Sequence, residues 1–231
     1  MQRSTIRSIV LTALLLILAT TAFAGGWAVI TIQSLPEYLV AGKPATMTFL
    51  IRQHGRTLAD MNASLSAAGS NGLSAKGVVT RTGNPGEYKA VLSVPQPGDW
   101  TIRIDADLGE SNLRPIRAIG EGDPAPAPLG EVVRGEHLFL AKGCVNCHIN
   151  KEVAARNLVP AGPELTGKKY PPDFLKKFLA DPAGTMGKSA EGFDMPDLNL
   201  SKIEIDAIAA FINRDRAPTQ THSESVRGDS R

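Results

Sequence analysis

The stretch GEGDPAPAPLG at residues 120–130 divides a chain of 231 residues into two parts of different character. Its three prolines stand at alternate positions, which favours an extended polyproline II conformation and a semi-rigid spacer. The residues before it alternate between apolar and polar types, whereas those after it repeat their apolar positions at helical spacing. The sequence therefore predicts two domains joined by a linker at residues 120–130.

Short strand-like runs fill the part before the linker, residues 25–119. The runs at residues 88–94 and 100–106 alternate cleanly, as half-buried antiparallel strands do. Turn signals rich in glycine and proline separate the runs. Six or seven such strands predict an all-β sandwich of immunoglobulin type, with residues 113–119 as a last edge strand.

Helical patterns fill the part after the linker, residues 131–215. Residues 132–141 lead directly into two cysteines, and Pro171-Pro172 opens a second helix. The tetrapeptide SKIE at residues 201–204 has the spacing of a capping box and begins a third helix. The predicted fold class is thus a two-domain protein with an all-β first domain and an all-α second domain. The polar, aperiodic residues 216–231 predict a disordered tail.

The first 24 residues have the pattern of a secretory signal peptide. Arg3 and Arg7 precede an apolar run at residues 9–19, and AFA at residues 22–24 has the spacing of a cleavage site. A retained membrane anchor is the alternative, although the run is shorter than the ~20 residues that span a bilayer. Either way, we expect a periplasmic or other extracytoplasmic location. The net charge of +2 disfavours nucleic acid as a partner.

The pentapeptide CVNCH at residues 144–148 contains both cysteines of the chain. This pattern is typical of covalent haem attachment, because two thiols bond the haem vinyl groups and the following histidine ligates the iron. A thioredoxin-like redox pair is one alternative, but it needs a βαβ context. A tiny disulfide would stabilise little. A zinc site would need two further ligands, and the remaining histidines are His54, His137 and His222. We predict one covalent haem c held by Cys144, Cys147 and His148.

Three further segments surround this motif. Gly135 and Phe139 precede it, GPELTG follows at residues 162–167, and Met195-Pro196 precedes the third helix. With these segments, residues 131 to about 214 resemble class I mono-haem cytochrome c. The resemblance implies that the carbonyl of Pro163 accepts a hydrogen bond from the ring of His148, which orients that ring. It also implies that Met195 ligates the iron opposite His148.

The choice of distal ligand has alternatives. Met186 lies in the flexible context GTMG, whereas the proline after Met195 fixes the backbone of the ligand loop, so we favour Met195. His137 and His222 are weaker candidates. Either methionine could instead fill a gap in the core. Independently of the ligand, we expect Phe211 in the last helix to pack on Phe139 in the first.

The first domain has its own resemblance. The segments at residues 38–44, 52–55 and 86–101 resemble the small bacterial immunoglobulin-like domains of the YtkA-like type. This implies a fold and a setting beside membrane redox proteins, but no activity. His54, Met47 and Met61 raise a copper hypothesis, which we disfavour because Met47 alternates like a core residue. We expect three aromatic residues in the sandwich core, namely Trp27, Tyr88 and Trp100.

These observations lead to one functional expectation. We expect an extracytoplasmic c-type cytochrome that is not itself an enzyme and that carries single electrons through a haem ligated by His148 and Met195. Its partners would be redox proteins associated with the membrane. The alternatives are a haem subunit of a membrane-associated oxidase or dehydrogenase complex, and a haem-based redox sensor.

Overall fold

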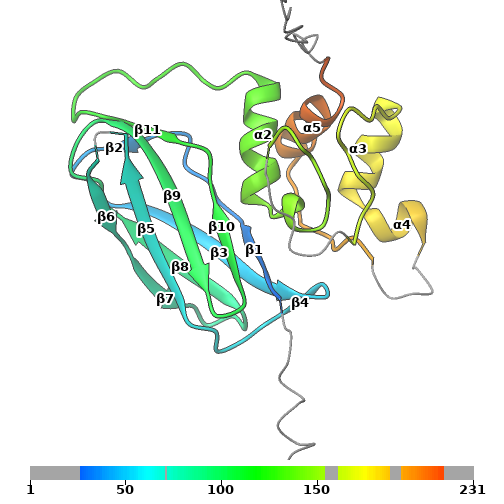
Figure 1. Ribbon diagram of the computed structural model, residues 1–231, viewed down its shortest axis with the longest axis horizontal. Coiled ribbons are helices and arrows are strands. Elements are labelled where there is room, and N and C mark those ends of the chain that lie inside the picture. Colours follow the sequence, from blue (N-terminus) through cyan, green and yellow to red (C-terminus); the bar gives the residue numbers. More distant parts are fainter. Residues whose placement is uncertain (1–26, 71, 154–160, 188–193, 216–231) are drawn as a thin grey trace, which may run out of the picture. The chain divides into compact units, whose positions relative to one another are not determined.

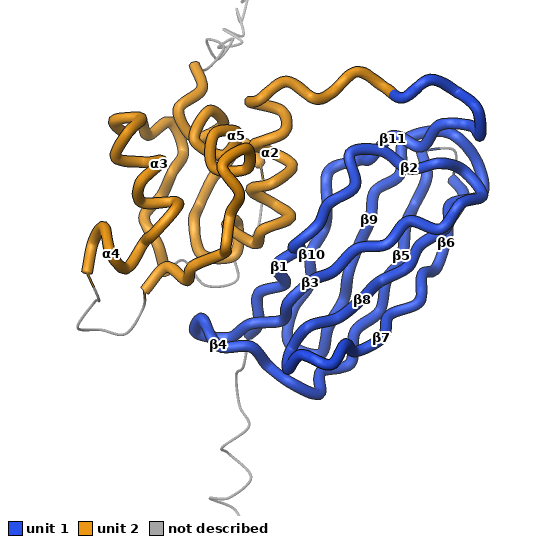
Figure 2. Tube along the Cα trace, turned by 180° about the vertical axis from the view of Figure 1, so that it is seen from behind, with its two compact units in different colours: residues 1–125 blue, residues 126–231 orange. Residues whose placement is uncertain are grey.

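The computed structural model describes residues 27–70, 72–153, 161–187 and 194–215. The chain forms two compact units, Met1–Ala125 and Pro126–Arg231, which are coloured separately in Figure 2. The division falls inside the proline-rich segment at residues 120–130. The signal-peptide pattern, the tail at residues 216–231 and His222 lie outside the described residues.

One sheet of the first unit is antiparallel, with the strand order β1-β3-β8-β7 and with β4 added to β3 (Figure 1). Its strands are β1 (Val29–Ile32), β3 (Ala45–Gln53), β4 (Arg56–Thr57), β7 (Val78–Arg81) and β8 (Glu87–Leu92).

The other sheet has the order β2-β11-β9-β5-β6, with β10 added to β9. Its strands are β2 (Leu39–Val40), β5 (Ala63–Gly69), β6 (Ser74–Lys76), β9 (Gly98–Ala106), β10 (Gly109–Asn112) and β11 (Ile116–Ile119). The pair β11–β2 is parallel and the others are antiparallel. The strand predicted within residues 113–119 exists as β11, but its predicted position at the edge of the sheet is wrong, because β11 lies between β2 and β9.

The inward faces of the two sheets form the core of this unit. Alternate residues of β9 are fully buried, as the period-2 pattern predicted, and Trp100 donates its indole N–H to the carbonyl of Gln96 at 3.0 Å. Phe49 stacks on Tyr88 with ring centroids 5.3 Å apart. The immunoglobulin-like sandwich and the core positions of Tyr88 and Trp100 are confirmed. The core position of Trp27 is wrong: it is half-buried and lies edge-on to His54.

The second unit contains helices in its described residues: α2 (Glu131–Ala141), the 3-10 turn η2 (Cys144–Asn146), α3 (Pro172–Ala180), α4 (Pro182–Met186) and α5 (Lys202–Ile212). The predicted capping box is confirmed, because the Ser201 side chain accepts from the backbone N–H of Glu204 while the Glu204 carboxylate accepts from that of Ser201. Asp181 caps α4 in a similar way through the N–H of Gly184 at 2.8 Å.

Helices α2 and α5 pack closely at Gly135. A Cβ on Gly135 would lie 2.0 Å from the carbonyl oxygen of Ala207, so only glycine allows this approach. The rings of Phe139 and Phe211 pack with centroids 5.4 Å apart, which confirms the predicted contact. The surrounding core is apolar and includes Cys144, Leu165, Leu175 and Leu179.

The predicted fold class needs correction. The described chain is predominantly β, with eleven strands in two sheets and only four short α-helices, and it gives no evidence of an all-α second domain of the cytochrome c fold. Proline and glycine recur between the helices, for example in GPELTG at residues 162–167, and keep these segments irregular. In the described residues, no helix is long and apolar enough to span a membrane.

Candidate functional site

The CVNCH motif follows a sharp end to α2. Gly143 adopts φ 78°, a left-handed conformation that glycine takes without strain, and its N–H donates to the carbonyl of Leu140. The chain then forms η2, in which the N–H groups of Cys147 and His148 both donate to the carbonyl of Cys144, at 3.2 and 2.9 Å. One tight turn therefore holds both cysteines and the histidine together.

Both cysteines are free thiols. Burial raises the pKa of Cys144 to about 12, and burial also raises the pKa of Cys147. Both sulfurs are therefore protonated at neutral pH. No group of three or more potential His, Cys, Asp or Glu ligands occurs among the described residues.

The imidazole of His148 is held at one nitrogen. Its Nδ1 lies 3.0 Å from the carbonyl oxygen of Pro163, which can only accept a hydrogen bond, so Nδ1 carries the proton. Burial lowers the pKa of His148, and the bond to Pro163 opposes part of that shift. The neutral ring consequently keeps the lone pair of Nε2 available for a metal ion.

A short pairing of two segments positions this ring. Gly162 donates its N–H to the carbonyl of Cys147 at 3.0 Å, and Leu165 donates to that of Ile149 at 2.8 Å. At the far end, Lys151 Nζ forms an ion pair with Glu164 Oε1 at 3.1 Å, and the Lys151 N–H donates to Thr166 Oγ1. Pro163 is thereby fixed between two backbone hydrogen bonds.

Gly162 makes the close pairing possible. A Cβ at this position would lie 2.3 Å from Cε1 and 2.5 Å from Nδ1 of His148. The sequence identified the segment GPELTG as part of the site, but it could not show why the first residue must be glycine. The reason is the contact with the ring of His148, which lies fourteen residues earlier in the chain.

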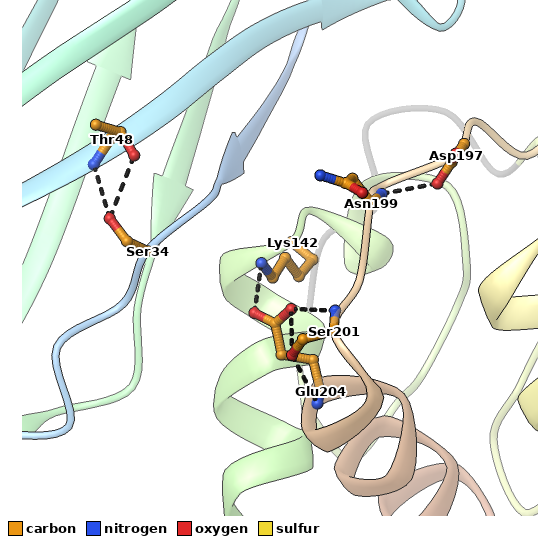
Figure 3. Close-up of polar contacts among 7 residues, drawn as sticks. All are labelled: Ser34, Thr48, Lys142, Asp197, Asn199, Ser201 and Glu204. Atoms are coloured by element: carbon orange, nitrogen blue, oxygen red, sulfur yellow. Dashed lines mark hydrogen bonds and ion pairs between the residues drawn. The ribbon is translucent and has the colours of Figure 1, made fainter.

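The two methionines differ in environment. Met195 is half-buried and packs against the hydrophobic core that includes Cys144, whereas Met186 at the end of α4 is 67% exposed. A turn follows Met195, in which Asp197 Oδ1 accepts the N–H of Asn199 at 2.7 Å (Figure 3). Of the histidine candidates, His137 is half-buried on α2.

An ion pair that the sequence did not indicate lies beside the motif. Lys142 is 3% exposed, and its Nζ lies 2.6 Å from Oε1 of Glu204 (Figure 3). The other oxygen of Glu204 accepts the N–H of Ser201 at 2.9 Å. One carboxylate therefore caps α5 and binds the residue that ends α2.

The copper hypothesis for the first unit gains no support. Met47 is fully buried in the sandwich core, as its alternation predicted. His54 lies in the tight turn between β3 and β4, with φ 49°, and is exposed.

Comparison with known proteins returned structural matches only: no family model and no curated protein matches the chain. Domains 4 and 5 of the S-layer protein SbsC share 18% identity over 41% of this chain and 54% of their own length, with a TM-score of 0.32. The Lin-41 filamin domain shares 14% over 46% of this chain and 98% of its own length, with a TM-score of 0.30. A superoxide reductase (neelaredoxin) variant from Ignicoccus hospitalis shares 14% over 41% and 83%, with a TM-score of 0.29.

At these TM-scores the matches carry no argument about function. No family model matches the chain, and its described residues contain eleven strands and only four short α-helices. The expected resemblances, of residues 131–214 to class I mono-haem cytochrome c and of the first domain to the YtkA-like type, are therefore corrected.

Proposed function

We propose that this chain binds one haem c covalently through Cys144 and Cys147, with His148 as an axial ligand, and carries single electrons. The observation that supports it most is the placement of two free cysteines on one turn with a histidine whose Nδ1 is hydrogen-bonded to the carbonyl of Pro163. Thioether formation uses thiols, and iron ligation uses a neutral imidazole with a free Nε2.

Each residue has a separate task in this proposal. The two sulfurs would form the thioether bonds to the haem, and the turn η2 sets their spacing. Pro163 holds the ring of His148 in one tautomer and one orientation. Met195, which packs against the core that includes Cys144, would supply the second iron ligand. The bound haem supplies a one-electron couple between ferric and ferrous iron.

The ligand set favours a carrier over a catalyst. If His148 and Met195 both ligated the iron, they would leave no coordination position for oxygen or a substrate. The thioether of Met195 favours the ferrous state and raises the reduction potential relative to two histidines. A haem subunit of a membrane-associated oxidase or dehydrogenase and a redox sensor remain outcomes that the experiment below distinguishes.

The setting belongs to the same proposal. The signal-peptide pattern at residues 1–24 supports export to an extracytoplasmic compartment, with cleavage or retention as an anchor. We assign the immunoglobulin-like unit to docking or spacing, and redox proteins at the membrane as partners.

The test is co-expression of the full chain with a haem c maturation system. We expect haem that stays with the polypeptide on a denaturing gel, an intact mass increased by one haem, and a low-spin spectrum. The variant Cys144→Ala/Cys147→Ala should lose covalent haem, while the matched surface variant Lys202→Met keeps it. Absence of covalent haem in the wild type refutes the proposal. A high-spin spectrum or ready CO binding favours the sensor, and copurification with a membrane oxidoreductase favours the subunit.

A further inference from the structure

Lys142 is the only charged side chain in the described part of the chain that is buried, with 3% of its surface exposed. It stands two residues before Cys144, and its ammonium group is paired with Glu204 at 2.6 Å. Removing a lysine from water is costly, and a buried ion pair contributes little to stability compared with apolar residues. Stability alone therefore does not account for the burial of Lys142.

The position of the pair relative to the motif suggests what that role is. Lys142 ends α2 immediately before the turn that holds both cysteines, and Glu204 lies in the first turn of α5 (Figure 3). The field of Lys142 reaches the motif: its positive charge acts to lower the pKa of the Cys144 thiol, against the larger effect of burial, which raises it.

We propose that Lys142 and Glu204 form a charge-compensated pair that sets the reduction potential of a haem bound at Cys144. This inference rests on the proposed function. Reduction adds one electron to the haem, so a nearby positive charge stabilises the ferrous form and a nearby negative charge stabilises the ferric form. In a poorly solvated interior, a charge acts more strongly than on the exposed surface, where water and salt screen it.

Removing the charge of Lys142 and removing the charge of Glu204 should shift the reduction potential in opposite directions. Lys142→Met leaves the carboxylate of Glu204 without its ammonium partner, so reduction becomes less favourable and the potential falls. Glu204→Gln keeps an amide oxygen that can accept the N–H of Ser201, but leaves Lys142 without its counter-charge, so the potential rises. The double variant Lys142→Met/Glu204→Gln removes both charges and should lie close to the wild type.

The experiment is a spectroelectrochemical titration of the haem-loaded full chain and these variants. We expect shifts of opposite sign and up to about tenfold in the equilibrium constant for reduction, which is ~59 mV for a one-electron couple. Lys142→Arg keeps the charge and should restore the wild-type potential. Lys202→Met is the matched control. Lys202 lies on α5, as Glu204 does, and forms an ion pair of 2.7 Å with Asp206, but its side chain is 88% exposed.

The outcomes separate this inference from the proposed function. Covalent haem in the wild type, with potentials of the two single variants that move in the same direction or stay unchanged, overturns the inference alone. A shared direction is what loosened packing and added water would produce. Absence of covalent haem overturns the proposed function. If Lys142→Met does not accumulate, the reduction potential of Glu204→Gln, compared with that of Lys202→Met, still tests the inference: a higher potential supports it, and an unchanged or lower one overturns it.

Discussion

Gly162 and His148 approach so closely that a single methyl group on Gly162 would overlap the imidazole ring, at 2.3 Å from Cε1. The same backbone segment supplies the carbonyl of Pro163 that accepts from Nδ1 of that ring at 3.0 Å. The contact and the hydrogen bond together leave the ring little freedom to rotate. The backbone of Gly162 and Pro163 therefore restrains the orientation of His148.

The variant Gly162→Ala tests this relationship. The added Cβ forces either the ring or the segment to move, which should weaken the bond to Pro163 and destabilise the fold by about 1–3 kcal/mol, as overpacking does. Chemical denaturation gives the free energy of unfolding, and the ring resonances of His148 in NMR spectra report its orientation. Gly130→Ala is the control, because nothing lies within 4 Å of the corresponding Cβ. Equal stability of the two variants would contradict the assignment.

Gly135→Ala tests the contact between α2 and α5. Its Cβ would stand 2.0 Å from the carbonyl oxygen of Ala207 and 2.6 Å from Cβ of Phe211, so the helices must separate and the packing of Phe139 on Phe211 must loosen. We expect a loss of about 1–3 kcal/mol despite the better helix propensity of alanine. Thermal unfolding followed by far-ultraviolet circular dichroism measures it. An unchanged or higher melting temperature would show that the helices do not meet at Gly135.

The sequence predicted the elements that repeat locally and missed those that depend on distant partners. Alternation marked β9 and the capping box marked the start of α5, because each signal lies within a few residues. The two-residue strand β2 carries no such period, so the sequence could not show that it pairs with β11 and moves that strand inside the sheet. The all-α class failed because helical periodicity in short segments does not establish a fold.

The same distinction applies to the site. The spacing of the CVNCH motif lies within five consecutive residues, so the sequence alone could show it. The burial of Lys142 was not, since its partner Glu204 lies on another helix and lysine is ordinarily exposed. The only available signal was a lysine directly after an apolar helical run.

A pH-dependent contact joins α3 to α5. Hydrogen bonds from Lys176 and Lys202 lower the pKa of Asp206 below its usual 3.8. A carboxyl group whose pKa is lower in the folded state stabilises that state at neutral pH, and the contribution is lost as the pH falls from about 3.8 through the folded value. NMR titration of the Asp206 carboxyl should give a low pKa that rises in Lys176→Met. The same pKa in both proteins would exclude this ion pair in solution.

The two methionines provide the sharpest test of the ligand assignment. Met195 packs against the hydrophobic core that includes Cys144, whereas Met186 is 67% exposed at the end of α4. In the haem-loaded protein, Met195→Ala should abolish the weak long-wavelength band of methionine-ligated ferric haem and lower the reduction potential, since the thioether favours ferrous iron. It should also open a position that binds CO. Met186→Ala should change neither property, because the removed side chain lies on the surface. Loss of the band in Met186→Ala but not in Met195→Ala would reverse the assignment, and its presence in both would assign the distal position to another residue.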